Sequence, residues 1–564
     1  MRMTRTSDLW WKNAVVYCLD VETYQDGNGD GIGDFAGLTQ RIDHLVRLGV
    51  TCVWLMPFYP TRERDDGYDI TDFYGVDPRL GTLGDFTEFV RTARDRGIRV
   101  IADLVVNHTS DHHPWFEDAR SSRDSAHRDW YVWRDEPPAK GEGPEGVVFP
   151  DSEDSLWEYD ERTDQYYLHR FYKQQPDLDI ANPAVRDEIA RIMGFWTELG
   201  LSGFRVDAVP FLLETDGQLD AEQLPDPHEY LADLRAFLGR RNGEAVLLGE
   251  VNLPYEETAK FFGEPSTGRG DELTMCFDFI GMQQMYLSMA RGEAGPLDRA
   301  LRDRPDAPRD AHWATFVRNH DELTLDKLSD EEREEVFAAF GPEKDMQLYD
   351  RGLRRRLPPM VGGDRRRIEL AYSLLFTLPG TPVLFYGEEI GMGENLAAEA
   401  RQAVRTPMQW TPEPTAGFSS ADPEKYPEPL ATGDYGPEHV NVQDQALDAD
   451  SLLSRIRVFA ERYRESPELA WGDVEILAAE DPAVLAHCSA LEGECVLALH
   501  NFSDRTVPVA LEMPGTKPGT ELADVLSGET CTVGDDGRVH AELGPYGYRW
   551  LRTCGNPGLG VRAA

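Results

Sequence analysis

The sequence contains no long apolar run. None of its 564 residues lies in a stretch approaching the roughly 18 consecutive apolar residues that a membrane-spanning helix requires. The beginning, Met1 to Asn13, has no apolar segment of the kind that a secretory leader carries. We therefore expect a cytoplasmic protein with no membrane-spanning segment and no membrane partner.

Basic residues are scarce relative to acidic ones. The chain has 57 Lys and Arg against 102 Asp and Glu, which gives a formal net charge of −45. Such a surface repels nucleic acids and anionic membranes, so we expect no nucleic-acid partner and a neutral substrate. A well-solvated surface explains the acidic excess most simply, and adaptation to salt is left open.

Cysteines are few and form no metal-binding pattern. The seven are scattered, and none forms a CxxC pair with another. The sequence therefore supports neither a zinc site nor a disulfide framework. Reduced thiols are the expectation for a cytoplasmic protein.

The chain does contain the material for a large globular core. Hydrophobic residues make up 41% of it and aromatic residues 10%. Short β-rich runs alternate with helical stretches, and this alternation predicts parallel βαβ units of an α/β fold. Eight strands can be counted, as in a (β/α)8 TIM barrel. The expected strands are Val15–Val21, Cys52–Met56, Ile98–Val105, Gly203–Val206, Ala245–Gly249, Met275–Phe279, Ala314–Val317 and Val383–Tyr386.

Two segments depart from this alternation. Residues 108–175 are rich in Trp, Tyr, Asp, Pro and Gly without a helical period, which predicts an irregular domain inserted after the third strand. In residues 469–553, short strands separated by turn residues predict an appended antiparallel β-sandwich. The barrel would then occupy residues 1–107 and 176–468, and residues 554–564 would form a loose tail.

Acidic residues follow three of the expected strands. Arg205 and Asp207 share a face of one strand, because side chains alternate along it. Taken alone, such a pair is more often a structural ion pair; here the guanidinium would lower the pKa of Asp207 and keep a nucleophile ionised. Glu250 ends the next strand, where partial burial would raise its pKa toward that of a general acid. Asp321 follows a later strand.

In a barrel, these three carboxylates would converge at the end where TIM-barrel active sites lie. Retaining cleavage of a glycosidic bond requires two carboxyl groups about 5–5.5 Å apart, one to attack and one to protonate the leaving oxygen. Neighbouring barrel strands can supply this spacing. The sequence therefore predicts an enzyme that acts on glycosidic bonds.

Four short segments occur in order at the ends of the third, fourth, fifth and seventh expected strands. They are Asp103-Leu-Val-Val-Asn107-His108, Gly203-Phe-Arg-Val-Asp207, Gly249-Glu250-Val-Asn252 and Asn319-His-Asp321. Together they resemble the signature of the α-amylase family, glycoside hydrolase family 13. The resemblance implies Asp207 as the nucleophile, Glu250 as the general acid/base and Asp321 as the substrate-distorting carboxylate. Since no catalytic carboxylate is missing, a non-catalytic sugar-binding relative is the weaker alternative.

The same resemblance assigns contacts with the reacting glucose. Two histidines look like those that bind its hydroxyls, and an Asp and a Tyr match a motif whose ring stacks on the sugar. Arg405 matches an arginine that caps the non-reducing end, which implies a blind pocket for an exo-acting enzyme. The residues assigned to substrate binding are Asp65, Tyr68, His108, Arg205, His320 and Arg405.

One loop has the spacing of a metal site. In Asp26-Gly-Asn28-Gly-Asp30-Gly-Ile32-Gly-Asp34, oxygen ligands recur at every second position, which suits Ca²⁺ better than a plain Asx turn. Gly37 stands where an EF-hand has its final Glu, so the loop is not an EF-hand. The family has a similar loop for structural Ca²⁺ or Mg²⁺, and no organic cofactor is expected. Resemblance also suggests a second metal site, formed by Asn107, Asp177, Phe211, Leu212 and Glu214.

Within the family, the chain resembles the trehalose synthase branch over nearly its whole length, for example in Arg318–Thr324 and Val404–Trp410. This resemblance implies the interconversion of maltose and trehalose. Glu399–Ala403 departs from the Gly-Asp-Arg-Asp-Gly run that is usual there, so a hydrolytic α-glucosidase on maltose or short α-1,4-glucans is the alternative. Both reactions share the covalent intermediate and differ in what attacks it. The sequence decides neither this outcome nor whether the chain forms a homo-oligomer.

Overall fold

The computed structural model describes residues 9–137, 148–149, 153–213, 227–263 and 270–553. Its centre is a closed barrel of eight parallel strands in the order β1-β14-β10-β9-β8-β7-β3-β2, which confirms the expected TIM barrel. The strands are β1 (Val16–Leu19), β2 (Cys52–Leu55), β3 (Arg99–Leu104), β7 (Gly203–Val206), β8 (Val246–Gly249), β9 (Met275–Phe277), β10 (His312–Phe316) and β14 (Thr381–Phe385).

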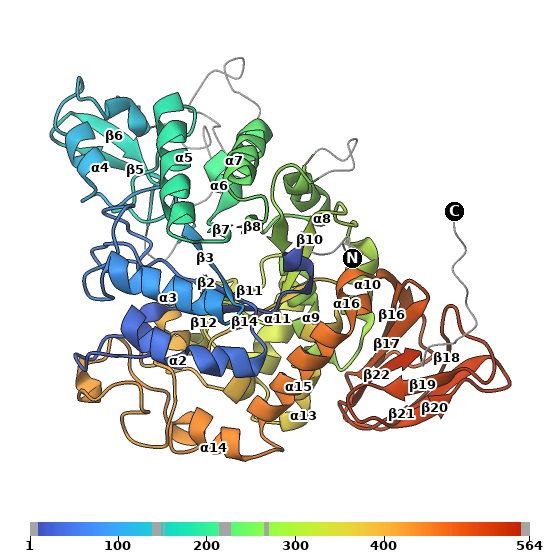
Figure 1. Ribbon diagram of the computed structural model, residues 1–564. Coiled ribbons are helices and arrows are strands. Elements are labelled where there is room, and N and C mark those ends of the chain that lie inside the picture. Colours follow the sequence, from blue (N-terminus) through green and yellow to red (C-terminus); the bar gives the residue numbers. More distant parts are fainter. Residues whose placement is uncertain (1–8, 138–147, 150–152, 214–226, 264–269, 554–564) are drawn as a thin grey trace.

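Helices surround this barrel (Figure 1). In α2 (Phe35–Leu48), Asp34 caps the first turn, and the buried residues Leu38, Ile42 and Leu45 share one face of the helix. Because helices cover the sheet, its strands are buried on both sides and read as continuous apolar runs. The other long helices are α3 (Leu83–Asp95), α5 (Pro183–Glu198), α7 (Pro227–Arg241), α9 (Phe279–Arg291), α10 (Gly295–Asp303), α11 (Asp330–Phe340), α13 (Arg365–Thr377) and α15 (Leu452–Glu465).

The segment inserted after β3 contains a small sheet beside the barrel. Its strands run in the order β4-β6-β5, and a short helix, α4, precedes them. The sequence predicted an irregular segment here, because strands of two to four residues are too short to show a period. The elements are α4 (Pro114–Ala119), β4 (Trp133–Arg134), β5 (Trp157–Asp160) and β6 (Gln165–Leu168).

Two antiparallel sheets follow α15, drawn in red in Figure 1. Six strands form one sheet in the order β15-β16-β17-β22-β19-β20, and β18 pairs with β21 in the other. The sequence did not predict β19, β20 or β21, and the expected tail at residues 554–564 lies outside the described residues. The strands are β15 (Asp473–Leu477), β16 (Val484–Leu491), β17 (Glu494–Asn501), β18 (Val507–Glu512), β19 (Glu521–Asp524), β20 (Thr530–Thr532), β21 (Arg538–Leu543) and β22 (Tyr548–Thr553).

The cysteines differ from the expectation in one respect. Cys488 and Cys495 form a disulfide between the adjacent strands β16 and β17, with their Cα atoms 6.6 Å apart. The expectation of reduced thiols is therefore wrong for this pair. The pairing depends on the register of the hairpin, which the sequence does not show. Cys18, Cys52 and Cys276 are free and buried. Cys554 lies outside the described residues.

The helices of the described residues show no candidate membrane span. None of them is both long enough and apolar enough to cross a bilayer.

Gly203 opens β7, two residues before Arg205, where the backbone φ is 146°. A Cβ atom there would overlap the carbonyl oxygen of Val246. We predict that Gly203→Ala lowers the free energy of unfolding by about 1–3 kcal/mol for the backbone conformation and about 1–3 kcal/mol for the overlap. The midpoint of urea unfolding measures this loss.

The matched control is Gly239→Ala on the exposed face of α7, where an added Cβ meets no atom within 4 Å. Alanine is the better helix former, so this variant should unfold at an equal or higher urea concentration. Equal midpoints for both variants would contradict the assigned backbone at Gly203.

Candidate active site

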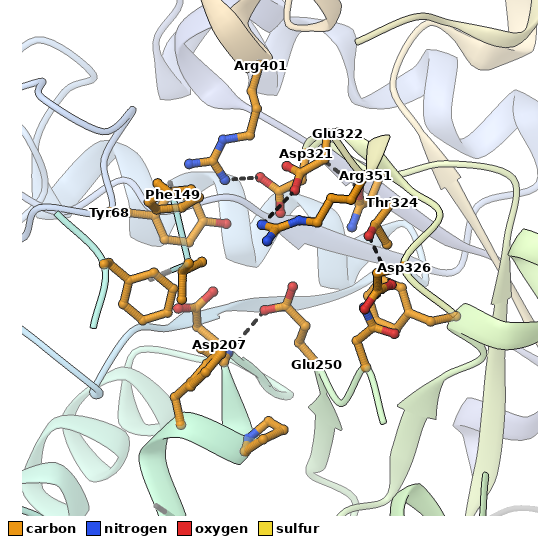
Figure 2. A pocket seen from close by; sticks show the side chains of 18 of the residues that line it. Tyr68, Phe149, Asp207, Glu250, Asp321, Glu322, Thr324, Asp326, Arg351 and Arg401 are labelled. Atoms are coloured by element: carbon orange, nitrogen blue, oxygen red, sulfur yellow. Dashed lines mark hydrogen bonds and ion pairs between the residues drawn. The ribbon is translucent and has the colours of Figure 1, made fainter. Parts of the chain in front are cut away.

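The ends of β7 and β8 bring Asp207 and Glu250 next to each other. Val206, the last residue of β7, pairs with Gly249, the last residue of β8, and the two acidic residues follow directly. The backbone N–H of Glu250 donates to the carbonyl of Val206 at 3.1 Å. Asp321 follows β10, and Figure 2 shows the carboxyl groups of all three residues facing the same space.

Arg205 is the buried cation that holds two of these carboxylates. Its side chain is 1% exposed. Nη1 donates to Oδ1 of Asp207 at 2.6 Å, and Nη2 donates to Oε2 of Glu250 at 2.8 Å. Nη1 also pairs with Asp103, which accepts a hydrogen bond from Nε1 of Trp54 at 2.8 Å. One planar guanidinium therefore fixes both carboxyl groups at the same end of the barrel.

Burial raises the pKa of both carboxyl groups. The pKa of Asp207 is raised to about 6, although the charge of Arg205 opposes the shift. Burial raises the pKa of Glu250 to about 7; Arg205 opposes this shift as well, while the charges of Asp207 and Asp321 add to it. Arg205 does lower the pKa of Asp207, but the expected net decrease is wrong, because burial outweighs the ion pair. Asp207 is still the more acidic group, so it can be ionised while Glu250 is protonated.

Asp321 has the opposite electrostatic surroundings. Its Oδ1 accepts from Nη1 of Arg401 at 2.6 Å and from Nη2 of Arg405 at 3.0 Å. Oδ2 lies 3.4 Å from Nε2 of His320. Burial would raise the pKa of Asp321, but the charges of His320, Arg401 and Arg405 outweigh burial and hold this pKa well below its usual range. The carboxyl group of Asp321 is therefore ionised at neutral pH.

The side chains of Asp207, Glu250 and Asp321 line a cavity of about 440 Å³ at the carboxyl end of the barrel. Five aromatic rings give it apolar walls, and the three carboxylates supply fixed polar groups, a combination that suits a small polar ligand with apolar faces. The rings belong to Tyr68, Phe149, Phe171, Phe211 and Phe279.

Arg401, rather than Arg405, lies on the wall of this cavity. Its Nη2 donates to Oδ1 of Asp65 at 3.1 Å, so one guanidinium bridges Asp65 and Asp321. Arg405 is 2% exposed and lies behind them, where Nε donates to the carbonyl of His320 at 2.8 Å. The sequence reasoning missed Arg401, although the signal was present: the usual Gly-Asp-Arg-Asp-Gly run has an arginine at the same place.

The other residues assigned to substrate binding fall into two groups. Asp65, Tyr68 and His108 line the cavity. His320 is fully buried, and its Nε2 lies 2.7 Å from the hydroxyl oxygen of Tyr68, with the two rings stacked at a centroid distance of 5.7 Å. Burial lowers the pKa of His108 to about 4, so it is neutral at pH 7. Through its contact with Tyr68, His320 supports the ring of that residue from outside the cavity.

Asp326, Lys327 and Arg351 also line this cavity, and nothing in the sequence marked them as site residues. Asp326 accepts hydrogen bonds from Nδ2 of Asn252 at 2.9 Å and from Nζ of Lys327 at 2.8 Å. Gln283 and Thr324 donate to the same carboxylate. The side chains of Lys327, Asp326 and Asn252 line the cavity with Arg351. These residues come from separate loops, which only the fold brings together.

The predicted metal loop forms a series of turns. The side-chain oxygens of Asp26, Asn28 and Asp30 each accept the backbone N–H of the residue two positions on, at 2.9 Å. Asp34 caps α2. Within the described part of the chain, no ion pair forms at Asp26, Asp30 or Asp34, so three carboxylates of one loop lack a cationic partner. A divalent cation would supply the missing positive charge.

Three carboxylates converge at another place. Ligand atoms of Glu22, Glu63 and Asp66 lie within 4.8 Å of one another. Arg79 pairs with Glu22 and Glu63, and Arg405 pairs with Asp66. Each carboxylate of the cluster thus already has a cationic partner, so the cluster does not require a metal.

The structure describes four of the five residues predicted to form the second metal site. Nε of Arg170 lies 3.3 Å from Oδ2 of Asp177, and both side chains are buried. Asn107 is also buried. The next residue, His108, forms an isolated β-bridge with Asp177. Phe211 lines the active-site cavity, and Leu212 is buried. Glu214 lies outside the described residues, and the site stays a prediction.

Comparison with protein families gives two matches. Residues 21–338 and 354–472 match the catalytic domain of α-amylase. Residues 493–552 match the C-terminal domain of sucrose hydrolase-like proteins. The first match covers the inserted sheet and every barrel strand except β1, and the second covers most of the C-terminal strands.

Individual relatives point the same way. The chain is 42% identical over 543 residues to a trehalose synthase of Thermus thermophilus, covering 96% of this chain and 55% of the relative. It therefore spans about half the length of that relative. It is 38% identical over 564 residues to a trehalose synthase of a Pimelobacter species, covering 98% of each chain.

A solved structure of a trehalulose synthase in complex with Tris superposes with a TM-score of 0.77 and 26% identity, covering 97% of this chain and all of the other. Three findings agree on the family: the barrel, the carboxylates at its carboxyl end, and the match to the catalytic domain over most of the chain. The chain belongs to the α-amylase family.

Proposed function

We propose that the chain is a retaining α-glucosyl-transferring enzyme that interconverts maltose and trehalose through a covalent β-glucosyl ester on Asp207. The observation that carries the proposal is the pair of carboxyl groups, Asp207 and Glu250, held by the single guanidinium of Arg205 at a cavity that Arg401 also lines. Similarity to trehalose synthases over most of the chain supports the choice of substrates.

In the first half of the reaction, a carboxylate oxygen of Asp207 attacks C1 of the non-reducing glucosyl unit. The bond from C1 to the glycosidic oxygen breaks, and Glu250 gives its proton to that oxygen. A pKa of about 7 for Glu250 keeps much of it protonated at neutral pH, and a pKa of about 6 leaves most of Asp207 ionised. The products of this step are the glucosyl ester and a free glucose.

In the second half, a hydroxyl of the retained glucose attacks C1 of the ester. Glu250, now a carboxylate held by Arg205 and by the N–H of Ala208 at 3.1 Å, takes the proton of that hydroxyl. The ester bond breaks and Asp207 leaves as a carboxylate. Attack by the anomeric hydroxyl gives trehalose, attack by the 4-hydroxyl regenerates maltose, and attack by water gives glucose.

The charged groups around Arg401 would hold the reacting sugar. Asp65 and Asp321 are bridged by Arg401, and such charge-assisted donors and acceptors suit the hydroxyls of a terminal glucose. Tyr68, supported by His320, offers its ring to an apolar face of the sugar. These contacts suit an exo-acting enzyme on a small α-glucoside.

The loop from Asp26 to Asp34 would hold a structural Ca²⁺ or Mg²⁺. Its ligands would be Asp26, Asn28, Asp30, the backbone carbonyl of Ile32 and Asp34. Among the described residues, Asp26, Asp30 and Asp34 form no ion pair, and this supports the assignment. Such an ion supplies positive charge that stabilises the loop before α2 and takes no part in glucosyl transfer.

Purified protein incubated with maltose is expected to produce trehalose in excess of free glucose, as followed by NMR. Glu250→Gln should lower kcat by about 10²–10⁴, because the glycosidic oxygen then leaves without a proton. Glu257→Gln, an exposed change of the same kind a few residues further on, should leave turnover unchanged. Glucose without trehalose would assign the hydrolytic alternative, and turnover that persists in Asp207→Asn would overturn both reactions.

The dependence of kcat/KM on pH should be bell-shaped. Activity is expected to fall below a pKa of about 6, where Asp207 becomes protonated, and above a pKa of about 7, where Glu250 loses its proton. With an aryl α-glucoside, whose leaving group needs little protonation, the first turnover by Glu250→Gln should keep the acidic limb and lose the basic limb. A basic limb that survives in this variant would mean that another group sets it.

After treatment with a chelator, the protein should bind Ca²⁺ or Mg²⁺ in isothermal titration and melt at a higher temperature when the ion is added. An ion at 100 times its Kd stabilises a protein by about 2.7 kcal/mol. Asp30→Asn should weaken binding, whereas Asp434→Asn, at an exposed position elsewhere, should not. Equal affinities in both variants would rule out the loop as the site.

A further inference from the structure

A second cavity, of about 360 Å³, lies outside the barrel where α2 packs beside α15. One face of α2 lines it, with residues at the i, i+3, i+4 and i+7 positions. It shares no lining residue with the active-site cavity. From α2 the lining residues are Gln40, Arg41, Asp43, His44 and Arg47. The others are Trp410, then Val442 and Ala446 of α14 (Val442–Leu447), and Arg457 of α15.

Three arginines face this cavity without a carboxylate partner. Arg41 lies over the ring of Trp410, with its guanidinium carbon 4.4 Å from the ring centroid, and its Nε donates to the side-chain oxygen of Gln25 at 2.6 Å. Nε of Arg47 donates to the backbone carbonyl of Asp43 at 3.1 Å. Nε of Arg457 is buried and has no hydrogen-bond partner among the described residues. Across the described ranges of the chain, none of the three forms an ion pair.

This lack of partners is unusual in a chain whose acidic residues outnumber its basic ones by 102 to 57. The two nearby carboxylates are already engaged. Asp43 pairs with Nε of Arg96 at 2.6 Å, outside the cavity. Glu389 accepts from the hydroxyl of Tyr17 at 2.9 Å and lies 2.8 Å from Nε2 of His44. The positive charge in the cavity is therefore left largely uncompensated.

The arginines also repel one another. Burial lowers the pKa of Arg457, the charge of Arg47 lowers it further, and Glu389 opposes the shift only in part. Guanidinium groups that line one partly buried cavity are unfavourable unless an anion lies between them. The fold therefore keeps a cluster of cations that a bound anion would stabilise.

We propose that this cavity binds a phosphate group, either as free phosphate or as part of a phosphorylated metabolite. A phosphate carries a charge of about −1.5 to −2 and offers at least three acceptor oxygens, which match several guanidinium forks better than a single carboxylate does. The free Nε–H of Arg457 would donate to one of these oxygens. The proposal does not depend on the reaction assigned to the barrel.

The test is isothermal titration of the full chain with inorganic phosphate and, separately, with glucose 6-phosphate. Ionic strength is held constant with chloride, and the active site is saturated with maltose. We expect one saturable site, weakened about 10-fold or more by Arg47→Gln and by Arg457→Gln, since each removes one charge-assisted donor. Arg464→Gln removes the same charge from an exposed position of α15 outside the cavity and should bind as the unmodified chain does.

The two probes separate the two sources of the phosphate group. Equal affinity for both, lost in Arg457→Gln, means that the phosphate ion alone is recognised; tighter binding of glucose 6-phosphate, lost in the same variant, means a phosphorylated metabolite. The proposal fails if neither probe shows saturable binding, if the double variant Arg47→Gln/Arg457→Gln binds normally, or if Arg464→Gln loses as much. Circular dichroism of each variant shows whether it is folded, and the binding result stands whatever product maltose gives.

Discussion

The carboxyl end of the barrel depends on one buried cation. Removing a charge from water costs several kcal/mol unless partners surround it, and breaking a buried pair costs about 3–5 kcal/mol. Arg205 meets this requirement with Asp103 on β3, Asp207 after β7 and Glu250 after β8. These strands are neighbours in the barrel. The contacts that satisfy the buried guanidinium are therefore the same ones that place the proposed nucleophile and general acid/base, so fold and chemistry cannot be changed independently here.

The three carboxylates of the site differ because they share cations unequally. Asp321 contacts two guanidinium groups, from Arg401 and Arg405, and stays ionised. Asp207 and Glu250 divide the one guanidinium of Arg205, and burial raises the pKa of each. Burial is the largest cause for both groups, and the charge of Asp321 also raises the pKa of both, so Glu250, at about 7, stays the weaker acid beside Asp207, at about 6. This order suits the proposed roles of Asp321 in binding, Asp207 as nucleophile and Glu250 as general acid/base.

The strand Gly203–Val206 and the carboxylate after it could be predicted, because a buried strand reads as a short apolar run and alternation fixes which side chains share a face. The direction of the pKa shift of Asp207 could not, since it depends on how burial compares with the ion pair. The related run has an arginine at the position of Arg401, but which of Arg401 and Arg405 lines the cavity depends on the short turn at Ala400–Val404. The disulfide between Cys488 and Cys495 likewise depends on the register of a hairpin.

In the proposed reaction, whether glucose or water attacks the ester depends on how well the part of the cavity around Asp326 holds the released sugar. Asp326 is fixed there by Asn252, Gln283, Thr324 and Lys327, so its side chain is already ordered before any sugar binds. A preordered polar wall loses little entropy when it binds hydroxyl groups, which favours retention of the glucose over its loss to solvent. Retention also keeps water from the ester, because a site filled by sugar excludes it. The isomerase outcome therefore requires of the protein only that this wall bind glucose longer than the glucose needs to turn and present its anomeric hydroxyl.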